Sequence, residues 1–324
     1  YDRTIVEDVS FANLYRRGYY LLTRTPGDPA GAYLSTGNVI RDSSFSAVGS
    51  VLQHRDASGA IVLLESSALV ENNTVTGGAN GVLSNYLTTT AVAPLLTARG
   101  NSFSVTNTAF NASGLADGSQ IGGSGAGQGN TITLAGTLSV PEGQNGVGIL
   151  VQYATGDVLV EGNNVTGSAT DAGAWLYQNN FPLQPVVLRG NRFVSSSPGS
   201  AAPGQGVGVL VTDDPALFGE SGSGPSYALL ESNDVSGFVR GVHLWRNGPS
   251  GGSAVEATLA FNRVVGNMTG LDNSFAGFSV PAENNWWGCS YGPGSTGAGC
   301  AGTADGTAGS VDTNPWLTLT ASAP

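Results

Sequence analysis

The chain contains no lysine, because all twelve of its lysine-plus-arginine positions are arginine, and it has two histidines. Its 23 acidic residues leave a formal net charge of −11. Nucleic acids and anionic membranes are bound through clustered positive charge, so this balance argues against both partners. No apolar run approaches the roughly 20 residues that span a bilayer, and we expect no membrane insertion.

Cysteine is also scarce, with only Cys289 and Cys300 present. The Gly-rich segment between them closes readily as a loop, which favours a disulfide, an oxidising compartment and an extracellular or cell-surface location. Two thiols without histidine neighbours are poor zinc ligands. The chain opens at Tyr1 and its first ten residues already have a strand-like pattern, so we expect an upstream portion to have been removed.

Two short motifs recur along the chain. The first is Asn-x-apolar after a short apolar strand, with degenerate copies at Val9 and Ser43, and its spacings of 22 to 42 residues are typical of a solenoid with loop insertions. Its clear copies begin at Asn73, Asn101, Asn130, Asn163, Asn191, Asn233, Asn262 and Asn284. The second motif is a four-residue strand opened by glycine, beginning at Gly18, Gly49, Gly81, Gly148, Gly173, Gly208 and Gly241.

Strands this short cannot bury a face alone, but successive turns stacked about 4.8 Å apart form continuous parallel sheets around one core. No helical period is present. The sequence therefore predicts an all-β fold, a right-handed parallel β-helix solenoid of about ten coils and roughly 45–50 Å in length. Stacked asparagines are expected to tolerate left-handed turns and to form a hydrogen-bonded ladder.

The chain resembles the right-handed β-helix superfamily that includes pectate-lyase-like enzymes and many bacterial surface proteins. The most specific part is Glu283-Asn284-Asn285-Trp286-Trp287-Gly288, followed by Gly292-Pro293 and by residues 311–317. This part looks like the terminal coil and cap of secreted β-helix proteins. The resemblance implies a single domain with coils over 1–283 and a cap over 284–324, in which Trp286, Trp287 and Trp316 plug the open core.

The period of two in the Gly-opened strands predicts an outward row that is unexpectedly apolar. Its interface candidates are Tyr20, Val51, Leu83, Leu150, Trp175 and Leu210. A large apolar patch usually marks an interaction surface, and three covers are open: loops of the chain such as 104–129 or 195–205, a second protein, or a glycan.

Beyond this row lie aromatic and charged residues that suit sugar binding, because rings stack on sugars while ions hold hydroxyls or carboxylates. The glycan-binding candidates are Tyr153, Trp175, Tyr177, Trp245 and Arg246. If the protein is an enzyme, Asp213 and Asp214, with Asp171 or Glu220 nearby and with His243, are the catalytic candidates for a glycoside hydrolase or polysaccharide lyase.

Two observations argue against catalysis. Polygalacturonase-like members of the superfamily combine acids with Gly-His-Gly and Arg-x-Lys segments, and neither is present here. Lyase-like members need a base beside a calcium-binding acidic cluster, whereas this chain has no lysine and dispersed carboxylates. The histidines and cysteines do not have the spacing of a metal site, so we expect no cofactor. Calcium at Asp213, Asp214 and Asp272 is the alternative, and it is weak because the oxygen-rich consensus of a calcium loop is missing.

These observations favour a non-catalytic extracellular structural or adhesive protein, a subunit of a surface layer, fibre or stalk. We expect it to assemble with itself or with another extracellular protein through the apolar sheet face or the ends of the solenoid. A polysaccharide-active enzyme or a glycan-binding module is the alternative.

Overall fold

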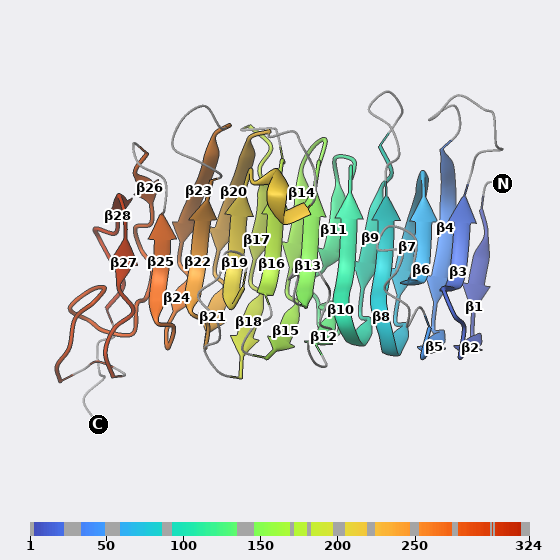
Figure 1. Ribbon diagram of the computed structural model, residues 1–324, viewed down its shortest axis with the longest axis horizontal. Helices are drawn as coiled ribbons and strands as arrows, with labels where there is room; N and C mark the ends of the chain where they lie inside the picture. Colours follow the sequence, from blue (N-terminus) through green and yellow to red (C-terminus); the bar gives the residue numbers. More distant parts are fainter. Residues whose placement is uncertain are drawn as a thin grey trace.

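A computed structural model describes residues 3–22, 34–48, 59–85, 93–134, 146–168, 172–179, 183–196, 205–218, 224–246, 253–273, 278–298, 300 and 302–318. The described chain is all-β, with parallel sheets running along an elongated molecule whose first and last strands lie at opposite ends (Figure 1). One four-residue 3-10 helix, η2 (Pro215–Phe218), is the only helix in these ranges. No helix in the described part has the length and apolar character needed to cross a membrane.

The first sheet, sheet A, has nine parallel strands, each hydrogen-bonded to the corresponding strand of the next repeat. In order these are β1 (Ile5–Glu7), β4 (Ser35–Arg41), β7 (Ser66–Glu71), β9 (Leu96–Arg99), β11 (Ser119–Gly122), β14 (Val158–Glu161), β17 (Val186–Arg189), β20 (Ser226–Glu231) and β23 (Val255–Ala260).

The second sheet, sheet B, is strongly curled and consists of two parallel strips joined by β8 (Thr74–Asn85) and β10 (Ser102–Ser113), which run through both. The first strip also holds β2 (Ser10–Ala12), β5 (Ser44–Ser46), β12 (Thr131–Leu134), β15 (Asn164–Gly167), β18 (Arg192–Ser195), β21 (Asp234–Ser236) and β24 (Arg263–Val264). The second strip also holds β3 (Arg17–Leu22), β6 (Gly59–Leu64), β13 (Val147–Gln152), β16 (Ala172–Tyr177), β19 (Val207–Thr212), β22 (Arg240–Trp245), β25 (Thr269–Asn273) and β27 (Thr307–Ala308).

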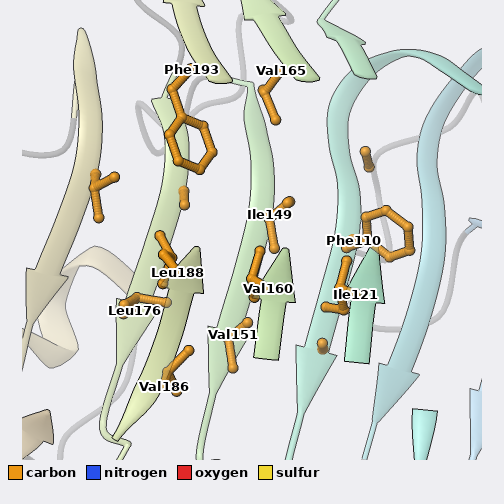
Figure 2. Packing of buried hydrophobic residues seen from close by; sticks show 14 of the residues in the cluster. Phe110, Ile121, Ile149, Val151, Val160, Val165, Leu176, Val186, Leu188 and Phe193 are labelled. Carbon is orange, nitrogen blue, oxygen red and sulfur yellow. The ribbon is translucent and has the colours of Figure 1, made fainter. Parts of the chain in front are cut away.

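One main core runs between the sheets. Figure 2 shows Ile149, Val151 and Leu176 of the second strip directed toward Val160 and Leu188 of sheet A. The glycines of the second strip sit where two parts of the chain approach closely. A Cβ atom on Gly173 would lie 2.4 Å from the carbonyl oxygen of Gly208 and 2.6 Å from the ring of Phe193. The recurring glycine therefore reflects lack of space at this position.

The asparagine ladder is confirmed. From Asn73 to Asn262, the backbone N–H and the side-chain amide of each rung donate to Oδ1 of the next rung, and the amide also donates to a backbone carbonyl. For Asn163 and Asn191 these distances are 3.0 Å from the backbone nitrogen and 2.9 Å from the amide nitrogen. The buried rungs are Asn73, Asn101, Asn130, Asn163, Asn191, Asn233, Asn262 and Asn285, and Ser43 precedes them.

Two details of the ladder differ from the sequence prediction. The last rung is Asn285 and not Asn284, which has a φ of 59°. The left-handed backbone falls on the residue before a rung, as at Asn72 and Ser232, and not on the rung itself. The rung needs ordinary backbone because its amide must point inward to reach its neighbours.

Three features lie in the C-terminal part of the described chain: a short strand pair, a disulfide and a group of tryptophans. β26 (Val280–Pro281) pairs with β28 (Val311–Asp312) in a two-stranded parallel sheet. Cys289 and Cys300 form the expected disulfide. Trp287 is completely buried in the main core, Trp316 packs against it, and Trp286 is 9 % exposed.

Candidate functional site

The outward positions of the second strip form one continuous row in register. Trp175 pairs with Leu150 and Leu210, and the row extends from Tyr20 through His243 to Asp272 and Ala308, with the polar Asn111 between Leu83 and Leu150. Val62 occupies the position between Tyr20 and Leu83. The prediction had given this position to Val51, which lies outside the described residues. Ile61 pairs with Tyr19 in this repeat, so Ala60 and not a glycine takes the position of the motif's Gly18.

Most of this apolar row is covered by the chain itself. Leu150, Trp175 and Leu210 form a second, smaller core with Val147, Ala172 and Val207, and Leu217 of η2 and Trp245 pack against it. In Figure 1, η2 lies in front of the strands of the second strip. Of the three covers considered, a loop of the chain is the one found, but the segment is 213–218 and not 104–129, which forms β10 and β11.

This burial corrects the candidate interface. Leu83 is 1 % exposed in a third cluster with Val62 and Leu64, and Leu210 is fully buried. Leu83, Leu150, Trp175 and Leu210 are therefore closed to a partner in this structure. Among the described interface candidates, Tyr20 alone is exposed, and Arg17 stacks over its ring at 4.1 Å.

The two candidate catalytic carboxylates are held inside the same covered region. Trp245 Nε1 donates to Asp214 Oδ2 at 2.8 Å, and Arg246 Nε lies 3.8 Å from Asp213 Oδ2. Both aspartates are at most 5 % exposed. Their arrangement anchors the segment that leads into η2. The partner acids considered from the sequence, Asp171 and Glu220, lie outside the described residues.

His243 lies next to this cluster and is 1 % exposed. Burial lowers the pKa of His243 to about 4; the nearby Asp272 carboxylate opposes this shift and Arg240 adds to it. Arg240 Nε donates to Asp272 Oδ2 at 2.8 Å, while His243 Nε2 lies 3.8 Å from the same oxygen. The imidazole is thus neutral at pH 7.

The glycan-binding candidates divide by burial. Tyr177 and Trp175 are buried, with the Tyr177 ring in edge contact with Tyr153 at 5.5 Å. Tyr153, Trp245 and Arg246 keep part of their surface exposed. The described residues contain no group of three or more His, Cys, Asp or Glu side chains placed to hold a metal ion.

A ladder of ion pairs along the C-terminal edge of sheet A was not anticipated. Arg41 lies 2.6 Å from Glu7, Arg99 lies 2.6 Å from Glu71, and Arg189 lies 2.8 Å from Glu231, each pair joining adjacent strands. The sequence signal was a charged residue closing each apolar-x-apolar strand before the turn. These exposed pairs are typical of a solvated strand edge and contribute little to stability.

Fewer side chains are buried in the first described segment than in the repeats that follow it. None of the described residues from 3 to 22 is buried. Val6, Phe11, Tyr19 and Leu21 pack on the main core but stay partly exposed, whereas their partners one repeat further in, Ile40, Phe45, Ile61 and Leu63, are at most 1 % exposed. Ile5 is 54 % and Tyr15 71 % exposed.

The opposite end is better closed. Phe278, Val311 and Trp316 pack over the core there, and Trp316 Nε1 donates to the Ser290 carbonyl at 3.2 Å. Asp305 accepts hydrogen bonds from the backbone of Gly266 and Asn267 and from the Asn267 amide. Burial raises the pKa of Asp305, and these hydrogen bonds oppose the rise.

Comparisons with protein-family models, with curated proteins and with solved structures found no match to this chain.

Proposed function

We propose that the protein is a right-handed parallel β-helix of about ten coils and that it serves as a non-catalytic extracellular scaffold, a subunit of a fibre, stalk or surface layer. Three strips of short parallel strands, each in register with the next repeat, support the fold. So does the asparagine ladder, in which every buried amide is satisfied by its neighbours. The Cys289–Cys300 disulfide supports an oxidising compartment.

Residues 284–324 act as the closing segment of this β-helix in our proposal. Asn285 is the last rung of the ladder, Trp287 is part of the main core, and Trp316 packs against that core. A solenoid needs a distinct terminal unit because its last repeat has no neighbour to cover its core. The bulk of Trp287 and Trp316 supplies that cover.

The observation that carries the structural role is the regular stack of repeats, in which each ladder asparagine from Asn73 to Asn262 is hydrogen-bonded to the rung of the next repeat. Such a stack gives a long, regular body, which suits a scaffold. We propose that a partner chain does not bind on the covered part of the second strip. The outer face has no apolar row left to offer, because residues 213–218 and Trp245 cover Leu150, Trp175 and Leu210.

Catalysis finds little support at the acids first considered. A general acid or nucleophile must reach a substrate atom, and Asp213 and Asp214 are buried and held by Arg246 and Trp245. Incubation of the wild-type protein with a panel of acidic and neutral polysaccharides, with assays for new reducing ends and unsaturated products, tests the proposal. We expect no scission. Scission that Asp213→Asn or Asp214→Asn abolishes, with fold retained by circular dichroism, would replace the scaffold with an enzyme.

A further inference from the structure

One carboxylate in the row of charged residues that ends the strands of sheet A lacks the partner that its counterparts have. Elsewhere in this row, glutamate and arginine of adjacent strands form ion pairs, namely Glu7–Arg41, Glu71–Arg99 and Arg189–Glu231. Opposite Glu161 of β14, the register instead places Gly122 of β11, which has no side chain. Within the described part of the chain, Glu161 forms no ion pair.

The strand neighbour on the other side does not supply the missing cation. Arg189 of β17 is in register with Glu161, but its Nε and Nη2 atoms donate to Glu231 Oε2 at 3.0 and 2.8 Å. A guanidinium is a rigid planar fork, so two donors directed at one carboxylate hold the whole group there. Glu161 is therefore left with its charge uncompensated by this row.

Glu161 lines an open hollow of about 430 Å³, a volume in the range of small-molecule sites. Its other walls are the loop after β11 and the turns of the next two repeats, represented by Gly123, Ser124, Gly125, Gly127, Gly129, Gly162 and Gly190. Backbone hydrogen bonds hold the loop in place. Gln128 N donates to the Gly125 carbonyl at 3.0 Å, and Gly123 N donates to the Glu161 carbonyl at 2.8 Å.

The glycines make the walls of this hollow from backbone. A Cβ atom on Gly129 would lie 1.9 Å from the Gly162 carbonyl oxygen, and one on Gly162 would lie 2.3 Å from the Gly123 carbonyl oxygen. Gly127 and Gly190 have a left-handed backbone, with φ of 75° and 59°, and a Cβ atom on either would meet no atom within 4 Å. Among the residues that line the hollow, Glu161 is the only charged one.

We propose that this hollow binds a guanidinium group of another molecule through the Glu161 carboxylate. The two carboxylate oxygens match the planar fork of a guanidinium, and the ion pairs of the same row use this combination at equivalent positions. The Ser124 hydroxyl and the carbonyl groups of the glycine walls are further acceptors for its N–H groups. The inference is independent of the structural role and adds a binding site to it.

Titration of the isotope-labelled protein with butylguanidinium, followed by the amide signals of residues 123–129 in NMR spectra, tests the site. N-butylurea has nearly the same shape without the charge, and butylammonium has the charge without the fork. We expect butylguanidinium to bind at least about tenfold more tightly than N-butylurea, because a hydrogen bond to a charged group is roughly twice as strong as a neutral one. Butylammonium should lie between them.

A second probe distinguishes two sources of the guanidinium. N-acetylarginine amide carries the group as it occurs in a polypeptide. If it binds as tightly as butylguanidinium, the hollow accepts an arginine side chain of another protein. If only butylguanidinium binds, the site takes a free small molecule.

Four variants connect the binding to Glu161. Glu161→Gln keeps the shape and should weaken butylguanidinium to the level of N-butylurea, whereas Glu256→Gln, at a half-buried acid of β23 outside the hollow, should leave binding unchanged. Ser124→Arg places a guanidinium of the chain itself in the hollow and should also weaken binding by about tenfold. Leu183→Arg, at a position that is 94 % exposed, is the control for an added charge. Circular dichroism checks that each variant folds.

Three results overturn the inference. Equal affinity for butylguanidinium and N-butylurea, or unchanged affinity in Glu161→Gln, removes the role of the carboxylate. Equal affinity for butylguanidinium and butylammonium shows that charge alone is recognised. Amide shifts with calcium chloride at lower concentrations than with butylguanidinium, lost in Glu161→Gln, assign the hollow to a metal ion. None of these results affects the non-catalytic scaffold, which fails only if polysaccharide scission is found.

Discussion

Replacement of one ladder asparagine by alanine should destabilise the protein far more than replacement of the asparagine beside it. Asn163 Oδ1 accepts hydrogen bonds from the backbone nitrogen of Asn130 at 3.1 Å and from its amide at 2.8 Å. The Asn163 amide donates to the Ile121 carbonyl and to Asn191 Oδ1, both at 2.9 Å. Asn163 is 1 % exposed, so no water replaces these partners without rearrangement.

The magnitude follows from the groups left without partners. In Asn163→Ala, the backbone N–H and one amide hydrogen of Asn130 lose their acceptor, while Asn191 Oδ1 keeps the bond from the backbone nitrogen of residue 163. A buried donor without an acceptor costs about 1–3 kcal/mol, so the two together reduce the free energy of unfolding by about 2–6 kcal/mol.

Asn164 provides the matched control, because it is the same residue type one position along the chain. Its side chain points outward and accepts one hydrogen bond from Arg192 Nη1 at 3.0 Å. Asn164→Ala should cost less than about 1 kcal/mol, as is usual for a surface substitution. Urea denaturation followed by circular dichroism measures both variants, and hydrogen exchange of the segment around Asn130 should be faster in Asn163→Ala only.

The reasoning would be refuted if the free energies of unfolding of Asn163→Ala and Asn164→Ala differed by less than about 0.5 kcal/mol, a difference no larger than the usual scatter of such measurements. Asn163→Asp sharpens the test because it keeps the acceptor and the shape but loses the amide donors. It should be as destabilised as Asn163→Ala at pH 7, with a partial recovery in acid, where a protonated carboxyl regains one donor.

Three further substitutions test the packing and the electrostatics. Gly173→Ala should lower stability by about 1–3 kcal/mol because its Cβ meets the Gly208 carbonyl and the Phe193 ring, whereas Gly306→Ala, with open space around it, should be close to neutral in the same thermal melts. Trp175→Asp should lower the free energy of unfolding by more than about 3 kcal/mol, since it places a carboxylate in the second core. The particle mass of the protein that still folds should equal that of the wild type. A folded variant with a different particle mass would show that this face is an interface. The pKa of His243 is about 4 in the folded protein and 6.5 for the free side chain. The unfolded chain therefore binds a proton at a higher pH than the folded chain does. The free energy of unfolding should fall by up to about 3 kcal/mol as the pH drops from 6.5 to 4. His243→Gln should remove this loss in denaturation curves at pH 4 and 7, and equal pH dependence in both proteins would contradict the assignment.

The strands and the ladder could be predicted from the sequence because the same residue pattern recurs in each repeat. Asparagine recurs because each rung hydrogen-bonds to the asparagine of the next repeat, and glycine recurs where there is no space for a side chain. The predicted position of Val51 lies outside the described residues, and Val62 of β6 lies between Tyr20 and Leu83. Ala60 stands in β6 where the neighbouring strands have a glycine, so the glycine motif did not identify this strand.

The cover of the outer face was harder to predict from the sequence, because outward apolar residues have the same pattern whether a loop, a partner or a ligand covers them. Leu217 lies only seven residues after Leu210, but nothing local indicated that η2 folds back over Trp175. The buried acids show the same difficulty. Asp213 and Asp214 suggest catalysis as a sequence pair, yet their partners, Arg246 and Trp245, come from the next repeat.

Two apolar regions of the molecule, the outer row under η2 and the C-terminal end of the core, are covered by other parts of the chain. A stack of repeats satisfies each strand with its neighbours, and here the additional core under η2 also removes the apolar row from the surface. The C-terminal end uses Trp287 and Trp316 for the same purpose. Leu217, Trp287 and Trp316 all lie outside the strands, so the cover of each region comes from segments that the strand pattern does not include. An outward apolar residue in a strand of this fold therefore does not by itself mark a binding surface.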